Sequence, residues 1–173
     1  MFDWLYDLIS QFWESFTPVV IIRTYENAVH LRVGKYHRSI EQPGLYWKVP
    51  FFDEILSETV VPTTMAITPQ SLVTKDGKSV VLKTIVKYEI HDIKTFLLSV
   101  YGANDAISDI IQGITKKVVE DRAFIDCMSM DEEITASAKK EIRKWGVRIL
   151  NVTVTNFSEM RSIRLLMDSE YDS

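Results

Sequence analysis

The chain has 173 residues, of which 46% are hydrophobic and 25% charged, a balance typical of a globular protein with a single core. Its net charge of −4 argues against nucleic-acid binding, because affinity for a phosphate backbone comes from clustered Lys and Arg side chains. The single Cys127 excludes an internal disulfide and fits a reducing compartment. We expect no membrane-spanning helix, which needs about 20 apolar residues. We expect no cleaved signal peptide either, because Asp3 and Asp7 interrupt the apolar N-terminus.

Residues 1–16 are predicted to form an amphipathic helix. Apolar side chains recur at helical spacing, and the apolar face is widened by Trp4, Tyr6, Leu8 and Trp13. The apolar stripe comprises Phe2, Leu5, Ile9, Phe12 and Phe16, and the opposite stripe comprises Asp3, Asp7, Ser10 and Glu14. Pro18 ends the pattern, and the apolar run that follows includes Val19 and Ile21.

Two interpretations of this helix remain open. It packs on its own domain or on a neighbouring subunit, or it lies in the plane of a membrane with its apolar face down. Its charged residues are all acidic, so binding to a membrane would have to be hydrophobic or shared among many subunits.

The next part of the chain predicts an antiparallel sheet. Residues 28–33 alternate as a half-buried strand that ends at Gly34, and Pro43-Gly44 forms a turn into a short strand at 45–49. Asp76-Gly77 is a strong hairpin signal. In the strand that follows, even-numbered residues from Val80 to Ile90 face the core.

Helices and one more strand complete the pattern, which is α+β: a curved, mostly antiparallel sheet with packed helices, preceded by the amphipathic helix. Residues 92–100 and 103–122 predict two helices. A capping box at Ser129–Glu132 predicts the start of a third helix, which ends near Gly146. Residues 147–157 alternate as the last strand.

No constellation of side chains indicates catalysis. The three histidines, His30, His37 and His91, have no metal-ligand spacing with Cys127 or with one another, and we expect them to be structural or exposed. Cys127 is interpreted as a small core residue. The sequence contains no phosphate-binding glycine loop and no nucleophile motif, so we expect neither enzymatic activity nor a metal or cofactor.

In order and spacing, five segments resemble the stomatin/prohibitin/flotillin family, also called band 7 or SPFH domains. They are "ENAVHLRVGKY", "QPGLYWKVPFFDEI", "SLVTKDGKSVVLKTIVKYEIHD", "NDAISDIIQGITKKVVED" and "KKEIRKWGVRILNVTVTNF", and they cover about residues 24 to 157.

The resemblance implies a non-enzymatic scaffold, anchored in a membrane by its N-terminus, that assembles with itself and acts on a membrane protease, a channel or another membrane protein. It divides the chain into a membrane-associating segment at 1–22, the domain at 23–158 and a short helical tail at 159–173. One departure is that residues 158–173 give no sustained heptad, where most members continue into a coiled coil. The alternative function is a soluble protein-binding module whose N-terminal helix docks on a partner protein.

Phe51 and Phe52 are candidates for a second shallow membrane contact, with Trp47 as a weaker one. The resemblance puts this region at the membrane-proximal end of the domain. Packing of both phenylalanines into the core is the competing interpretation.

Overall fold

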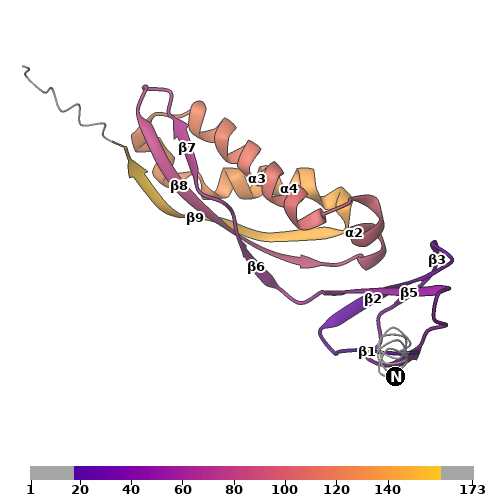
Figure 1. Cartoon of the computed structure of the whole chain (residues 1–173). Helices are drawn as coiled ribbons and strands as arrows, with labels where there is room; N and C mark the ends of the chain where they lie inside the picture. The colour runs from indigo at the N-terminus through magenta and orange to yellow at the C-terminus, as the bar shows by residue number, and fades with distance from the viewer. Residues whose placement is uncertain (1–17, 161–173) are drawn as a thin grey trace, which may run out of the picture.

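The computed structural model describes residues 18–160 of the chain. They form an α+β structure built from three antiparallel sheets and a layer of helices, which confirms the predicted fold class (Figure 1). The predicted helix at residues 1–16 and most of the predicted C-terminal tail, residues 161–173, lie outside the described residues.

The N-terminal part of the described chain contains two small sheets. One is a two-stranded ribbon of β1 (Val19–Ile22) and β4 (Gly44–Trp47). The other has three strands in the order β3 (Lys35–Ile40), β2 (Glu26–Arg32) and β5 (Asp53–Thr59). A small cluster around Ile22, Ala28 and Ile40 joins the two sheets.

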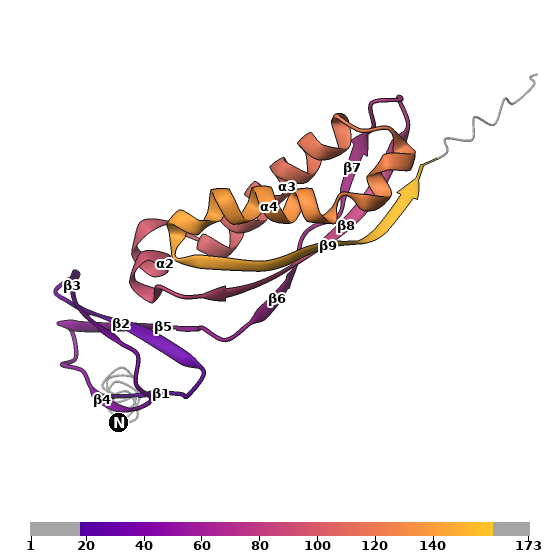
Figure 2. The same cartoon turned by 180° about the vertical axis from the view of Figure 1, so that it is seen from behind.

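The C-terminal part is a sheet centred on one long strand, β8 (Ser79–Ile90). β8 pairs with β6 (Thr63–Ala66), with β7 (Gln70–Val73) and, along nearly its whole length, with β9 (Val147–Glu159). Helices α3 (Ala103–Glu120) and α4 (Asp131–Ile142) lie side by side on one face of this sheet (Figure 2). The short α2 (Ile93–Ser99) contacts β2 and so connects the two parts.

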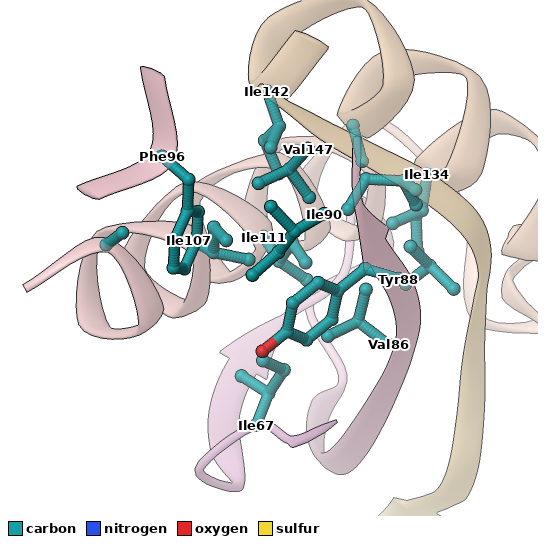
Figure 3. Packing of buried hydrophobic residues seen from close by; sticks show 14 of the residues in the cluster. Ile67, Val86, Tyr88, Ile90, Phe96, Ile107, Ile111, Ile134, Ile142 and Val147 are labelled. Atoms are coloured by element: carbon teal, nitrogen blue, oxygen red, sulfur yellow. The ribbon is translucent and has the colours of Figure 1, made fainter. Parts of the chain in front are cut away.

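The main core lies between this sheet and its helices. Alternate residues of β8 point inward, as the sequence predicted, and Val86, Tyr88 and Ile90 turn toward Ile107 and Ile111 of α3 (Figure 3). Tyr88 is buried, which raises the pKa of its phenol, and its hydroxyl donates to Asn104 Oδ1 at 2.9 Å. The core therefore fixes the long sheet and leaves the N-terminal ribbon at one end of the molecule.

Two turns form as predicted. The Asp76-Gly77 turn joins β7 to β8, with Gly77 at a φ of 78°. Gly146 has a φ of 74° and ends η2 (Arg143–Trp145) just before β9. An added Cβ at Gly146 would lie 2.5 Å from the Asp92 carbonyl oxygen, so both the backbone conformation and the close packing require glycine there.

Two local predictions are wrong. Residues 28 to 31 of β2 do not alternate, because all four are buried: Ala28 faces the small cluster while Val29 and Leu31 belong to the main core. The strand also ends at Arg32, before Gly34. A strand that packs between two apolar layers has no face in contact with solvent, so its sequence does not need to alternate between apolar and polar residues.

The capping box at Ser129 does not form. Ser129 is the last residue of a 3-10 turn, η1 (Phe124–Ser129), and its hydroxyl donates to the Asp126 carbonyl at 3.4 Å. Met130 occupies the N-cap position of α4 and is buried. The 3-10 turn leads directly into α4, so the serine is too early in the chain to cap it. The three acidic residues 131–133 still lie in the first turn, where the helix dipole favours them.

Candidate membrane-facing surface

The ribbon of β1 and β4 has one buried and one exposed face. Val19 is paired with Trp47 and Ile21 with Leu45, so these four side chains share a face. Val20, Ile22 and Tyr46 lie on the other face and pack against the small cluster. On the outward face Ile21, Leu45 and Trp47 are 68%, 60% and 71% exposed, and Val19 is half-buried.

The loop after β4 extends this apolar face. Val49 and Phe52 are 51% and 60% exposed, and Phe51 is 82% exposed with its backbone at a positive φ of 68°. These exposures exclude core packing for Phe51 and Phe52. We call Val19, Ile21, Leu45, Trp47, Val49, Phe51 and Phe52 the apolar platform.

Backbone hydrogen bonds, within the loop and to the turn between β2 and β3, fix the shape of the loop. The amides of Phe52 and Asp53 both donate to the Val49 carbonyl, at 3.2 and 2.9 Å. The Val33 amide, in the turn between β2 and β3, donates to the Phe52 carbonyl at 2.6 Å. The phenylalanines thus project from a loop tied to the neighbouring sheet.

The buried carboxylate of Asp53 holds the base of this loop. It accepts from Arg32 Nε at 2.8 Å, from Arg32 Nη2 at 3.1 Å and from the Val49 amide at 2.9 Å. His30 Nε2 lies 3.3 Å from Asp53 Oδ2, without the alignment of a hydrogen bond. The Arg32 bonds, followed by the Val49 amide, hold the pKa of Asp53 well below its usual range. Asp53 therefore remains a carboxylate that fastens the loop to β2.

The sequence candidates divide into two groups. Val19, Ile21, Phe51 and Phe52 lie on the platform. The remaining candidates lie outside the described residues: Phe2, Trp4, Leu5, Leu8, Ile9, Phe12, Trp13 and Phe16.

Sequence reasoning missed Leu45 and Val49 as surface residues and underrated Trp47. It predicted a short strand at 45–49, which contains all three, but did not pair that strand with residues 19–22. The matching alternation of Val19 and Ile21 is the signal that favours the pairing.

The described residues contain no metal-binding cluster, and their one cysteine is not exposed. Within residues 18–160, no three His, Cys, Asp or Glu side chains are grouped so as to hold a metal ion. Cys127 is buried, and burial raises the pKa of its thiol. His91 is fixed by a 2.9 Å hydrogen bond between its Nδ1 and the Gly146 carbonyl. In this same range no helix is both long enough and apolar enough to cross a bilayer.

Comparison with known proteins settles the family. The model of the SPFH domain / Band 7 family matches residues 20–168. The chain belongs to this family. Homologues with an SPFH domain are membrane-associated.

Several relatives share the domain. Protein HflK of Haemophilus influenzae is 30% identical over 156 residues, which cover 88% of this chain and 38% of the relative. Stomatin-1 of Caenorhabditis elegans is 22% identical over 154 residues, 87% of this chain and 45% of the relative. An uncharacterized protein of Methanothermobacter thermautotrophicus is 27% identical over 144 residues, which cover 81% of this chain and 45% of the relative. The chain spans less than half the length of these relatives.

Proposed function

We propose that this SPFH protein is a non-enzymatic scaffold that sits on a membrane surface through the apolar platform and the segment at residues 1–22. The observation that carries the proposal is the continuous run of exposed apolar side chains on the ribbon and its loop. Exposed apolar patches of this kind mark sites of interaction with proteins or membranes, and a rim of aromatic and aliphatic residues suits the boundary between lipid and water.

The platform is built to stay apolar and exposed. The inward face of the ribbon packs on the small cluster, so the outward side chains cannot turn in without breaking the β1–β4 register. Full burial of a large apolar side chain yields about 1.5 to 3 kcal/mol, and shallow immersion yields part of that. Several such residues together provide a useful but reversible affinity.

The nature of the partners is part of the same proposal. We expect the protein to assemble with copies of itself on the membrane and to contact a membrane protease, a channel or another membrane protein. A relative named HflK and a relative named stomatin support a role among membrane proteins. The described domain would face a reducing compartment, in keeping with a single, buried cysteine.

Vesicle flotation of a platform variant tests the proposal. Trp47→Ser combined with Phe52→Ser removes two exposed aromatic side chains while leaving the core intact. Binding to neutral phosphatidylcholine vesicles should fall about tenfold or more, because each tenfold requires only about 1.4 kcal/mol. The loss should persist in high salt, since the contact is hydrophobic.

A matched control comes from the other end of the molecule. Ile125 and Met128 of η1 are 70% and 73% exposed, and η1 lies between α3 and α4 far from the ribbon (Figure 1). Ile125→Ser with Met128→Ser should leave flotation unchanged. Equal losses for both pairs would mean that vesicle binding follows general surface hydrophobicity, and the platform would not be the contact.

Deleting residues 2–16 separates the scaffold from the alternative function. On the scaffold account the truncated protein binds vesicles more weakly than the full chain, and the platform variant in the truncated protein does not bind. If the full chain fails to float with any vesicle but forms a discrete soluble complex with another protein, the docking module is the correct interpretation.

A further inference from the structure

A basic hollow lies at the start of β9, on the part of the molecule that the helices cover. It has a volume of about 580 Å³. Lys139 of α4, Arg143 of η2, Arg148 of β9 and His91 line it, and all four are exposed. No acidic side chain is among its lining residues. In a protein of net charge −4, such a one-signed hollow selects an anionic partner.

Two of these cations are free to bind a partner. Arg148 pairs with Glu89 at 3.1 Å, whereas Lys139 and Arg143 form no ion pair with any residue between 18 and 160. Cations near a helix C-terminus are favoured by the helix dipole, which accounts for Lys139 and Arg143 individually. The dipole does not account for Arg148, which comes from a strand and faces the same hollow.

The base of the hollow is apolar. Val147 and Ile149 are buried there, and Leu150 is half-buried. A ligand that matches both features carries apolar side chains next to a set of acids. The chain itself contains such a segment, because Asp168, Glu170 and Asp172 follow a stretch that has a single cation, Arg164, and four apolar residues: Ile163, Leu165, Leu166 and Met167.

We propose that the basic hollow binds the acidic segment at residues 163–172 of a second copy of this chain. Three acids at alternate positions face Lys139, Arg143 and the rest of the basic rim, and the apolar residues before them cover Leu150. The contact goes beyond membrane scaffolding and does not depend on lipid.

The same chain is badly placed to fill its own hollow. β9 carries the chain about 35 Å from Arg148 to Glu159, at roughly 3.3 Å per residue. If the chain reversed at Met160, even a fully extended path of about 3.5 Å per residue would span only about 28 Å by Asp168, which is too short to return to Arg148.

The direct return path is also occupied. α4 side chains cover the outer edge of β9, where Thr135 Oγ1 accepts from the Val152 amide at 3.0 Å and Asp131 Oδ1 accepts from the Val154 amide at 3.1 Å. A neighbour has no such constraint. Because the hollow lies at the start of β9 and the tail follows the end of β9 in the sequence, the contact is head-to-tail, and repeating it produces a ring or a filament.

Charge reversal at each side of the contact tests the proposal in the full-length protein, in mild detergent, by sedimentation velocity. Two variants are compared with the wild type. The hollow variant carries Lys139→Glu and Arg143→Glu, and the tail variant carries Asp168→Lys, Glu170→Lys and Asp172→Lys. Each variant should form a particle of lower mass than the wild type. Combining all five substitutions restores opposite charges and should restore the mass. A Lys83→Glu/Lys87→Glu variant, which changes the net charge as much as the first variant but on the exposed face of β8, should sediment like the wild type.

Mixing the two single-sided variants gives a sharper result. In each variant hollow and tail carry the same sign, but the tail of each is opposite in charge to the hollow of the other, so a one-to-one mixture should assemble although neither variant assembles alone. If wild-type protein is monomeric, or if both charge reversals leave its mass unchanged, the proposal is overturned. The Trp47→Ser/Phe52→Ser variant should associate normally, so that a failure of the membrane proposal and a failure of this one are distinguishable.

A peptide of residues 161–173 provides a second measurement. Its labelled form should bind the full-length tail variant, whose hollow is intact, and should bind about tenfold more weakly once Lys139→Glu/Arg143→Glu is added. A peptide with Asp168→Asn, Glu170→Gln and Asp172→Asn is the matched control. Equal binding of both peptides would show that the hollow does not recognise the acidic side chains.

Discussion

At the scale of single residues, Asp53 connects the sheet to the loop that carries the exposed phenylalanines. Its carboxylate is bound by the Arg32 guanidinium and by the Val49 amide, so one buried group fixes both ends of a short loop. The arrangement lets the loop present Phe51 and Phe52 outward without flexibility at its base. Nothing in the local pattern of residues 42–53 reveals this ion pair, because Arg32 lies 21 positions earlier in the chain.

The acid sensitivity of folding follows from this carboxylate. Arg32 lowers the pKa of Asp53 in the folded protein, while the unfolded chain keeps the ordinary value of 3.8. Unfolding therefore takes up a proton at low pH, so the stabilisation is complete above about pH 4 and is lost as the pH falls toward the folded-state pKa. The urea midpoint should drop between pH 5 and pH 3.

Asp53→Asn is the variant that checks this dependence. It should be less stable than the wild type at pH 7 and should lose less stability on acidification, because the titrating group is gone. Some dependence of stability on pH should remain in the variant, since hydrogen bonds from Thr74 and Thr95 lower the pKa values of Asp76 and Asp92 as well. An unchanged slope between pH 5 and pH 3 would show that Asp53 does not contribute to it.

At the scale of elements, the hairpin of β2 and β3 contains an unfavourable turn. Its two central residues, Val33 and Gly34, have φ values of 50° and 71°, as in a type I′ turn. Gly34 suits such a turn, but a β-branched residue in the left-handed region costs about 1 to 3 kcal/mol. Val33 is 69% exposed, so little packing offsets the strain.

Val33→Asn should therefore stabilise the protein by about 1 kcal/mol, since asparagine tolerates this conformation and Asn-Gly is the preferred pair. The amide that donates to Phe52 is kept. Thermal unfolding of the two proteins at neutral pH is the measurement, with Gly34→Ala as a comparison that should be destabilised. A lower melting temperature for Val33→Asn would mean that the valine side chain contributes more by packing than its backbone loses by strain.

Strands that expose one face to solvent were predicted well from the sequence, whereas strands that are buried on both faces were predicted poorly. β8 alternates because helices cover one of its faces and solvent the other, and its periodicity was correctly interpreted. β2 is buried on both faces and its alternation was misread. The partnership of β1 with β4 depends on tertiary contacts with Ala28 and Ile40, so no local pattern could establish which strand residues 19–22 would join.

At the scale of the whole molecule, the two proposed contacts lie on different parts of an elongated structure. The apolar platform occupies the end that carries β1, and β9 leads away from this end to its tip at the other (Figure 1). The family resemblance predicted the family and the fold class correctly. The basic hollow was not foreseen, because its cations come from separate elements and meet only in the folded chain.

The depth of Trp47 in a bilayer tests the central claim most directly. A protein with Trp4, Trp13 and Trp145 changed to Phe keeps Trp47 as its only indole. With vesicles containing brominated phosphatidylcholine, the account predicts a blue shift of its emission and quenching that is strongest for bromines near the headgroups. A protein that keeps Trp145 alone, which is half-buried against the main core, should not be quenched. Trp47 emission that is neither shifted nor quenched while the protein floats with the vesicles would contradict the account.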